Sequence, residues 1–114
     1  MRVLSSAKPV PMDNLGLAEA SLVALKQIMQ RPYGLILVCG PTGSGKTTLI
    51  KALIHSFPPE ERVLVIEDTP ELKLPRENTV FLCTRIDSRS ELPPVTLRIL
   101  VKQALRMRPD RILI

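Results

Sequence analysis

Residues 40–47 read Gly40-Pro41-Thr42-Gly43-Ser44-Gly45-Lys46-Thr47 and match G-x-x-x-x-G-K-[ST], a pattern typical of phosphate-binding loops. Such a loop turns several main-chain N–H groups toward the same phosphates, and glycines permit the backbone angles and close approach that this requires. Lys46 is a cation able to reach the β- and γ-phosphates, and Thr47 offers a hydroxyl to Mg²⁺. A helix that begins here directs the positive end of its dipole at the anion.

The segments on either side of the loop provide the context that the motif needs. The apolar run Leu35–Cys39 lies between Gly34 and Gly40 and predicts a buried parallel strand. Residues 48–56 carry apolar side chains at helical spacing, and Pro58 and Pro59 then stop the helix. We therefore predict a strand–loop–helix unit that binds ATP or ADP together with Mg²⁺. Residues 40–48, which include Lys46 and Thr48, are predicted to contact the nucleotide.

Composition limits the kinds of protein that this chain represents. Its 114 residues suffice for one domain, and no apolar run approaches the ~20 residues that a membrane-spanning helix needs. The beginning of the chain does not resemble a secretory signal. Cys39 and Cys83 lie far apart in apolar segments, which predicts two buried thiols in a reducing cytoplasm.

The formal net charge of +5 is open to three interpretations. It is compatible with nucleic-acid binding, with an anionic membrane surface, or simply with an anion site and surface arginines. The only aromatic residues are Tyr33, Phe57 and Phe81, which offer no platform for stacking bases. We therefore expect no direct nucleic-acid ligand.

The rest of the chain alternates between helical and strand patterns. Residues 1–14 contain Pro9 and Pro11 and predict a linker or arm, and residues 15–114 then form a partial P-loop domain. We expect a helix at 17–30, with Leu22, Leu25, Ile28 and Met29 on one face, and strands at 63–66, 79–84 and 112–114. This alternation predicts an α/β fold with a mainly parallel sheet, specifically a three-layer P-loop architecture or part of one.

A further helix is expected from Leu97 to Met107, with Thr96 as its N-cap. Its predicted buried stripe consists of Leu97, Leu100, Val101, Ala104 and Leu105. On another face, Arg98, Lys102 and Arg106 follow one another at intervals of four residues. That basic row is typical of a solvated face, although it also suits a binding surface.

Three stretches together resemble the type II/type IV secretion ATPases, the hexameric motors of secretion, pilus assembly and conjugal transfer. The first is residues 40–49, which are similar to the family's Walker A segment. The second, Val65-Ile66-Glu67-Asp68-Thr69-Pro70-Glu71-Leu72, resembles its acidic Asp box. The third, residues 103–113, resembles the lead into its Walker B strand and is most similar to the VirB11-like branch.

The resemblance implies a RecA-like fold and a role for each site residue. Glu67 would position or polarise the attacking water, and Asp68 would join Thr47 at Mg²⁺. Arg85 and Arg108 would contact the γ-phosphate or a neighbouring subunit. For Glu67 and Asp68 the alternative is a pair of solvated loop carboxylates. The implied partners are five further copies in a homo-hexamer and an inner-membrane secretion or pilus machine, in the cytoplasm or at the membrane's inner face.

The sequence also departs from the family pattern. The family's Walker B strand is followed by Gly-Glu, whereas this sequence ends at Ile114, and His55 does not replace the family's later histidine box. We therefore expect a domain truncated at the Walker B strand that binds nucleotide weakly and hydrolyses it poorly. The alternatives to a motor ATPase are a nucleotide-sensing module without motor activity and a small-molecule kinase or transferase.

Overall fold

The computed structural model describes residues 10–114 apart from positions 75, 87, 88 and 90. The chain divides into two compact units, residues 1–57 and residues 58–114. Each unit has a hydrophobic cluster of its own. The predicted linker at 1–14 falls partly on residues 1–9, which lie outside the described residues.

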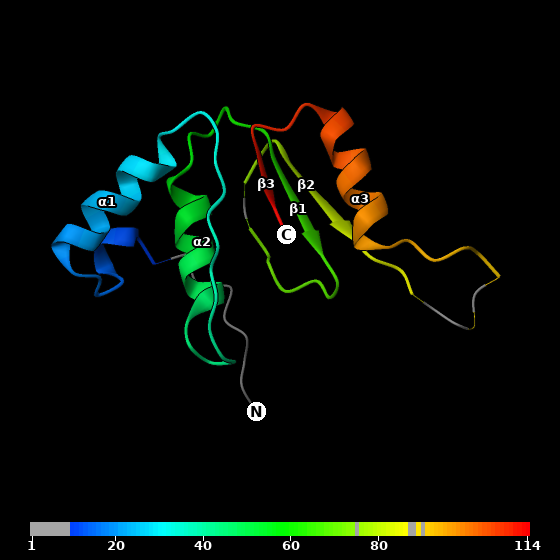
Figure 1. The fold of residues 1–114 in the computed structure, drawn as a ribbon, viewed down its shortest axis with the longest axis horizontal. Helices are drawn as coiled ribbons and strands as arrows, with labels where there is room; N and C mark the ends of the chain where they lie inside the picture. Colours follow the sequence, from blue (N-terminus) through cyan, green and yellow to red (C-terminus); the bar gives the residue numbers. More distant parts are fainter. Residues whose placement is uncertain (1–9, 75, 87–88, 90) are drawn as a thin grey trace. The chain divides into compact units, whose positions relative to one another are not determined.

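The first unit contains a short 3₁₀ helix, η1 (Met12–Asn14), and two α-helices, α1 (Glu19–Met29) and α2 (Lys46–Ser56) (Figure 1). Both α-helices were predicted from the sequence. Met12, Met29, Ala52 and Leu53 form the buried cluster, and Leu22 and Leu25 pack against it. Ile28, predicted to share that buried face, is 44% exposed.

The prediction of a buried strand at Leu35–Cys39 is wrong. The structure assigns these residues no strand, and Leu35 and Leu37 are 82% and 75% exposed. A parallel strand is stable only when a neighbouring strand accepts and donates its main-chain hydrogen bonds. Within the part of the chain that the structure describes, no strand pairs with this segment, so its apolar sequence is not sufficient to form one.

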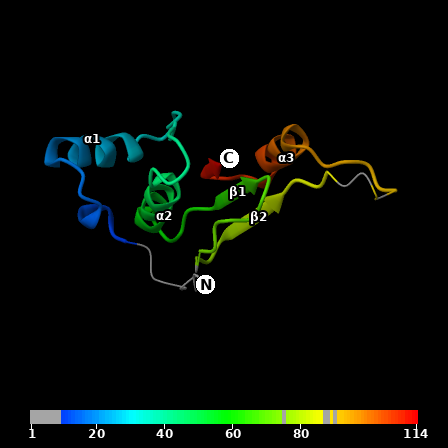
Figure 2. The same cartoon turned by 90° about the horizontal axis from the view of Figure 1, so that it is seen from below.

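The second unit is an open three-stranded parallel sheet with a helix on one face (Figures 1 and 2). Its strands are β1 (Val63–Glu67), β2 (Thr79–Cys83) and β3 (Arg111–Leu113), in the order β2-β1-β3. The register pairs Val63 with Thr79 on one side and with Arg111 on the other. The α/β class with a parallel sheet, predicted from the sequence, is confirmed.

The central strand β1 is buried on both faces, as expected for a parallel strand with no polar residue until its end. The four residues from Val63 to Ile66 are at most 1% exposed. Helix α3 (Leu97–Ala104) packs on one face, where Leu64 and Ile66 form a buried cluster with Leu100 and Ala104. The buried strand β1 therefore holds in place the polar residues that follow it.

Helix α3 begins as predicted, because the Thr96 hydroxyl accepts a hydrogen bond from the main-chain N–H of Ile99 at 3.4 Å. It ends earlier than predicted, and a 3₁₀ turn, η2 (Leu105–Met107), follows. The tighter turn rotates Leu105 away from the buried stripe, leaving it 66% exposed. The prediction that Leu105 is buried is therefore wrong.

Polar contacts connect the segments at the edge of the sheet where the strands begin. Arg111 forms an ion pair with Glu61 at 2.5 Å, and the Asp110 carboxylate accepts a hydrogen bond from the main-chain N–H of Arg62 at 2.6 Å. The Arg76 guanidinium donates to the Glu61 carbonyl at 3.0 Å. These contacts join the turn before β1 to the start of β3 and to the segment before β2.

The prediction of two buried thiols is also wrong, since Cys39 and Cys83 are both free and exposed. Cys39 belongs to the segment that forms no strand. On β2, Val80 and Leu82 pack toward the α3 cluster, whereas Phe81 and Cys83 alternate onto the exposed face.

Candidate functional site

The phosphate-binding motif forms a loop that leads into the amino-terminal end of α2 (Figure 1). Gly43 and Gly45 have φ angles of +80° and +90°, in the left-handed region that favours glycine. A Cβ added at Gly40 would lie 2.6 Å from Ser44 Oγ and 3.3 Å from Ser44 Cβ. The glycine at position 40 therefore lets the loop close on itself.

The first turn of α2 presents main-chain donors without a partner. Gly45 is the N-cap residue and supplies no side-chain cap. Among the described residues, the N–H groups of Gly45, Lys46, Thr47 and Thr48 find no acceptor in the protein. Because donors at a helix start need a partner, and the helix dipole favours an anion there, this end of α2 suits a phosphate group.

The Lys46 ammonium group folds back over the same loop. It donates hydrogen bonds to the carbonyl oxygen of Gly40 and, at 2.8 Å, to that of Pro41. Thr47, the next residue, is exposed in the first turn of the helix. The motif thus brings free amides, an ammonium group and a hydroxyl together at one end of α2.

In the second unit, the acidic stretch forms a loop at the carboxyl-terminal edge of the sheet, which we call the acidic loop (residues 67–72). Both oxygens of the Glu67 carboxylate accept main-chain hydrogen bonds. Oε2 accepts from the N–H of Glu71 at 3.2 Å and Oε1 from the N–H of Leu72 at 3.1 Å. The side chain at the end of β1 therefore closes the loop that follows it.

Asp68 is held from the neighbouring strand. Thr84, the residue after β2, donates its hydroxyl to Asp68 Oδ1 at 3.0 Å, and its main-chain N–H donates to the Glu67 carbonyl at 3.0 Å. The hydroxyl also lies 3.3 Å from the Asp68 carbonyl oxygen. Asp68 is exposed, and its second carboxylate oxygen has no hydrogen bond within the described residues.

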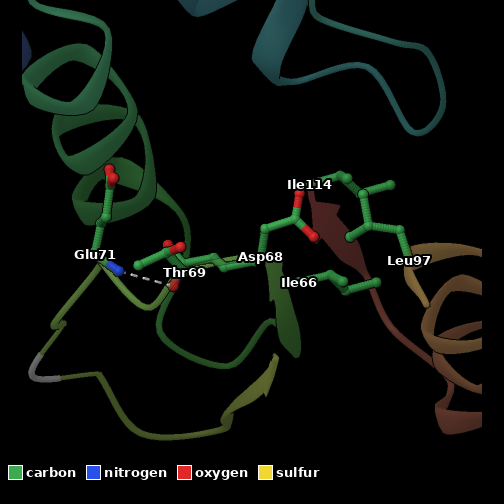
Figure 3. A pocket seen from close by; sticks show the side chains of 7 residues that line it. Ile66, Asp68, Thr69, Glu71, Leu97 and Ile114 are labelled. Carbon is green, nitrogen blue, oxygen red and sulfur yellow. Dashed lines mark hydrogen bonds between the residues drawn. The ribbon is translucent and has the colours of Figure 1, made fainter. Parts of the chain in front are cut away.

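An open pocket of about 300 Å³ adjoins the acidic loop, lined by Ile66, Glu67, Asp68, Thr69, Glu71, Leu97 and Ile114. In Figure 3 the Asp68 carboxylate points toward Ile114, and the apolar side chains of Ile66 and Leu97 line the same pocket. The Glu71 carboxylate points away from them. Of the two carboxylates that the figure labels, Asp68 is the one that points toward Ile114, and Glu67 also lines the pocket.

The two predicted arginines lie in the second unit as well. Arg85 pairs with Val95 in an antiparallel bridge, and its guanidinium donates to the Pro93 carbonyl at 3.0 Å. Arg108 is exposed and has a φ of +51° at the turn after η2. Contact of either residue with a phosphate or another subunit stays a prediction.

Sequence reasoning missed Thr84. Its position just after a predicted strand was a partial signal, because residues that follow two paired parallel strands meet at the same edge of the sheet. The register that pairs Glu67 with Cys83 places Thr84 opposite Asp68. That register cannot be obtained from one sequence without knowing which strands are neighbours.

The residues fit a nucleotide-bound Mg²⁺ better than a metal held by protein alone. Within the described ranges, no three His, Cys, Asp or Glu side chains are grouped to hold a metal ion. Mg²⁺ that accompanies a nucleotide needs only one or two protein oxygens, because phosphates and water complete its shell. In the first unit the Thr47 hydroxyl is an oxygen donor of that kind; in the second unit the Asp68 carboxylate is another, and each is considered on its own.

Comparison with known proteins gives the family. A family model described as type II/IV secretion system protein matches residues 1–114. Protein VirB11 of Agrobacterium fabrum is 53% identical over 79 residues, covering 69% of this chain and 23% of that protein. A putative conjugal transfer protein of Mycobacterium tuberculosis H37Rv is 47% identical over 78 residues, covering 68% of this chain and 22% of that protein.

The type IV secretion system protein VirB11 of Bartonella henselae is also 53% identical over 79 residues. This chain spans less than a quarter of the length of these relatives. No helix among the described residues has both the length and the apolar character needed to cross a bilayer. On the match of the family model to the whole chain, this protein belongs to the type II/IV secretion system protein family.

Proposed function

We propose that this chain binds the polyphosphate of ATP or ADP and serves as the nucleotide-binding part of a secretion or conjugation ATPase. The observation that carries the proposal is the set of unpartnered N–H groups at the start of α2, beneath a lysine that lies over the same loop. The family match and the relatives named for type IV secretion and conjugal transfer support the choice of machine.

In this proposal the phosphates bind in the loop of residues 40–48 and accept hydrogen bonds from the main-chain N–H groups of residues 45–48, which are fixed in place before the ligand arrives. Lys46 exchanges its bonds to the Gly40 and Pro41 carbonyls for bonds to phosphate oxygens. The Thr47 hydroxyl and the Asp68 carboxylate are ligands for Mg²⁺. When bound, Mg²⁺ neutralises charge that develops on the phosphates during transfer.

The larger assembly is part of the proposal too. A homo-hexamer acting with inner-membrane secretion or pilus machinery follows from the family resemblance, with Arg85 and Arg108 as candidate contacts to a phosphate or a neighbouring subunit. The cytoplasm, or the cytoplasmic face of the inner membrane, is the proposed location.

Calorimetric titration of the chain with ATP, ADP and AMP in the presence of Mg²⁺ tests the proposal. A loop built for a polyphosphate should bind ATP and ADP at least tenfold more tightly than AMP, which lacks the β-phosphate, a difference of about 1.4 kcal/mol or more. Equal affinity for all three nucleotides would point to recognition of the base and sugar instead. Absence of heat with all three would refute nucleotide binding by this chain.

A further inference from the structure

Helix α3 carries a row of cations on the side that faces away from the sheet. Leu100 and Ala104 are 8% and 0% exposed on the sheet side. Arg98 and Lys102 each lie two residues before one of them, about 200° away around the helix, and both are exposed. Arg106, in η2, is exposed as well. In Figures 1 and 2 no helix or strand of the second unit covers this outer side of α3.

The basic row, which consists of Arg98, Lys102 and Arg106, has no acidic neighbour on its own helix. The segment 93–109 contains four cations and no Asp or Glu. Within the described residues, the three side chains of the row make no hydrogen bond or ion pair. A helix face that only meets water usually mixes the two signs of charge, because opposite charges four residues apart stabilise it. The uniform sign of this row therefore indicates a surface with an anionic partner.

The surroundings of the row narrow the choice of that partner. Ile99 and Leu105, next to Arg98 and Arg106 in the chain, are 44% and 66% exposed. Protein interfaces combine arginine with apolar side chains in this way. By contrast, α3 has no aromatic residue on which a base could stack. Its apolar stripe already packs against the sheet, so that stripe is not available for insertion into a bilayer.

We propose that the basic row is a docking surface for an acidic helix of a partner protein. Arg98 and Lys102 lie about 6 Å apart along the axis of α3, at ~1.5 Å per residue. Carboxylates at intervals of four residues on a helix alongside have the same spacing, so that ion pairs form in register along the row. Apolar side chains of that helix then cover Ile99 and Leu105. The inference goes beyond nucleotide binding and does not depend on it.

Fluorescence anisotropy with two synthetic helical peptides of equal composition tests the inference. In the first peptide, three glutamates recur at every fourth residue with a leucine beside each. In the second, the same residues are spread around the helix. The full chain, without nucleotide, should bind the first peptide about tenfold or more tightly than the second, because only the first pairs all three charges. Added salt should weaken this binding.

A charge reversal within the row tests the register. Lys102→Glu should weaken binding of the first peptide about tenfold or more, because it sets like charges against each other. A third peptide, with lysine in place of the central glutamate, should recover binding to this variant. The matched control is Lys73→Glu, at another exposed lysine whose side chain has no hydrogen bond or ion pair in the described structure. That control should change the affinity by less than about threefold, and circular dichroism should show unchanged helix content in both variants.

Three results would overturn the inference: equal affinity for the first two peptides, equal losses in Lys102→Glu and Lys73→Glu, or no recovery with the third peptide. Each would show that only net charge acts. Vesicles of phosphatidylglycerol with phosphatidylcholine, and a single-stranded oligonucleotide, serve as competitors. If either displaces the labelled first peptide at a lower concentration than the unlabelled peptide does, the surface belongs to lipid or nucleic acid instead. Failure of the ATP titration is a separate outcome, because no nucleotide is present here.

Discussion

Replacing Lys46 with alanine is expected to weaken ATP binding about 10- to 100-fold. Hydrogen bonds to charged groups contribute about 1.5–3 kcal/mol, and each 1.4 kcal/mol is about a tenfold change in affinity. In the free protein the ammonium group bonds to the carbonyls of Gly40 and Pro41, so it already lies over the loop that would receive the phosphates. Titration calorimetry with ATP measures the change.

Lys51→Ala is the matched control for this prediction. Lys51 lies on the same helix, α2, and its side chain has no hydrogen bond or ion pair within the described part of the chain. The Lys51→Ala substitution removes the same charge outside the motif. It should change the ATP affinity by less than about threefold, roughly the effect of one screened surface charge. If both variants lose affinity equally, Lys46 acts only through the net charge of the chain.

Replacing Leu64 with alanine is expected to lower the free energy of unfolding by about 2–5 kcal/mol. Leu64 is 0% exposed at the centre of the sheet and belongs to the cluster with Leu100 and Ala104. Truncation removes its buried methyl groups and leaves a cavity that neighbouring strands on both sides keep open. Since domains of this size are stable by about 5–15 kcal/mol, the loss is a large part of the total.

Urea denaturation followed by circular dichroism measures this change, with Leu105→Ala as the control. The same substitution at Leu105, which is 66% exposed, should change stability by about 0.5 kcal/mol or less. Equal losses at the two positions would show that Leu64 is not a central contact of the core.

The elements that the sequence predicted well are those whose signals are local. The helix after the loop, the Thr96 cap of α3 and the apolar strand at Val63–Ile66 each depend on neighbouring residues in the chain. The loop at residues 40–47 has a signal of the same local kind, because its glycines and lysine lie within eight residues, and its binding of phosphate stays a prediction. The positions of all these features could therefore be read from spacing alone.

What the sequence could not predict depends on partners distant in the chain. Leu35–Cys39 has a strand-like composition, yet pairing decides whether such a segment becomes a strand, and the described structure provides no partner. Likewise, Thr84 reaches Asp68 only because β1 and β2 are neighbours in one register. The exposure of Cys83 depends on the side of β2 that α3 leaves uncovered.

The central claim is that main-chain amides at the start of α2 hold a polyphosphate. Amide chemical shifts recorded as ATP is added test it most directly, because each donor reports its own hydrogen bond. The account predicts that the largest changes occur at residues 45–48, the unpartnered amides at the start of α2. Saturable changes confined to other residues, with the signals of 45–48 unmoved, would contradict it.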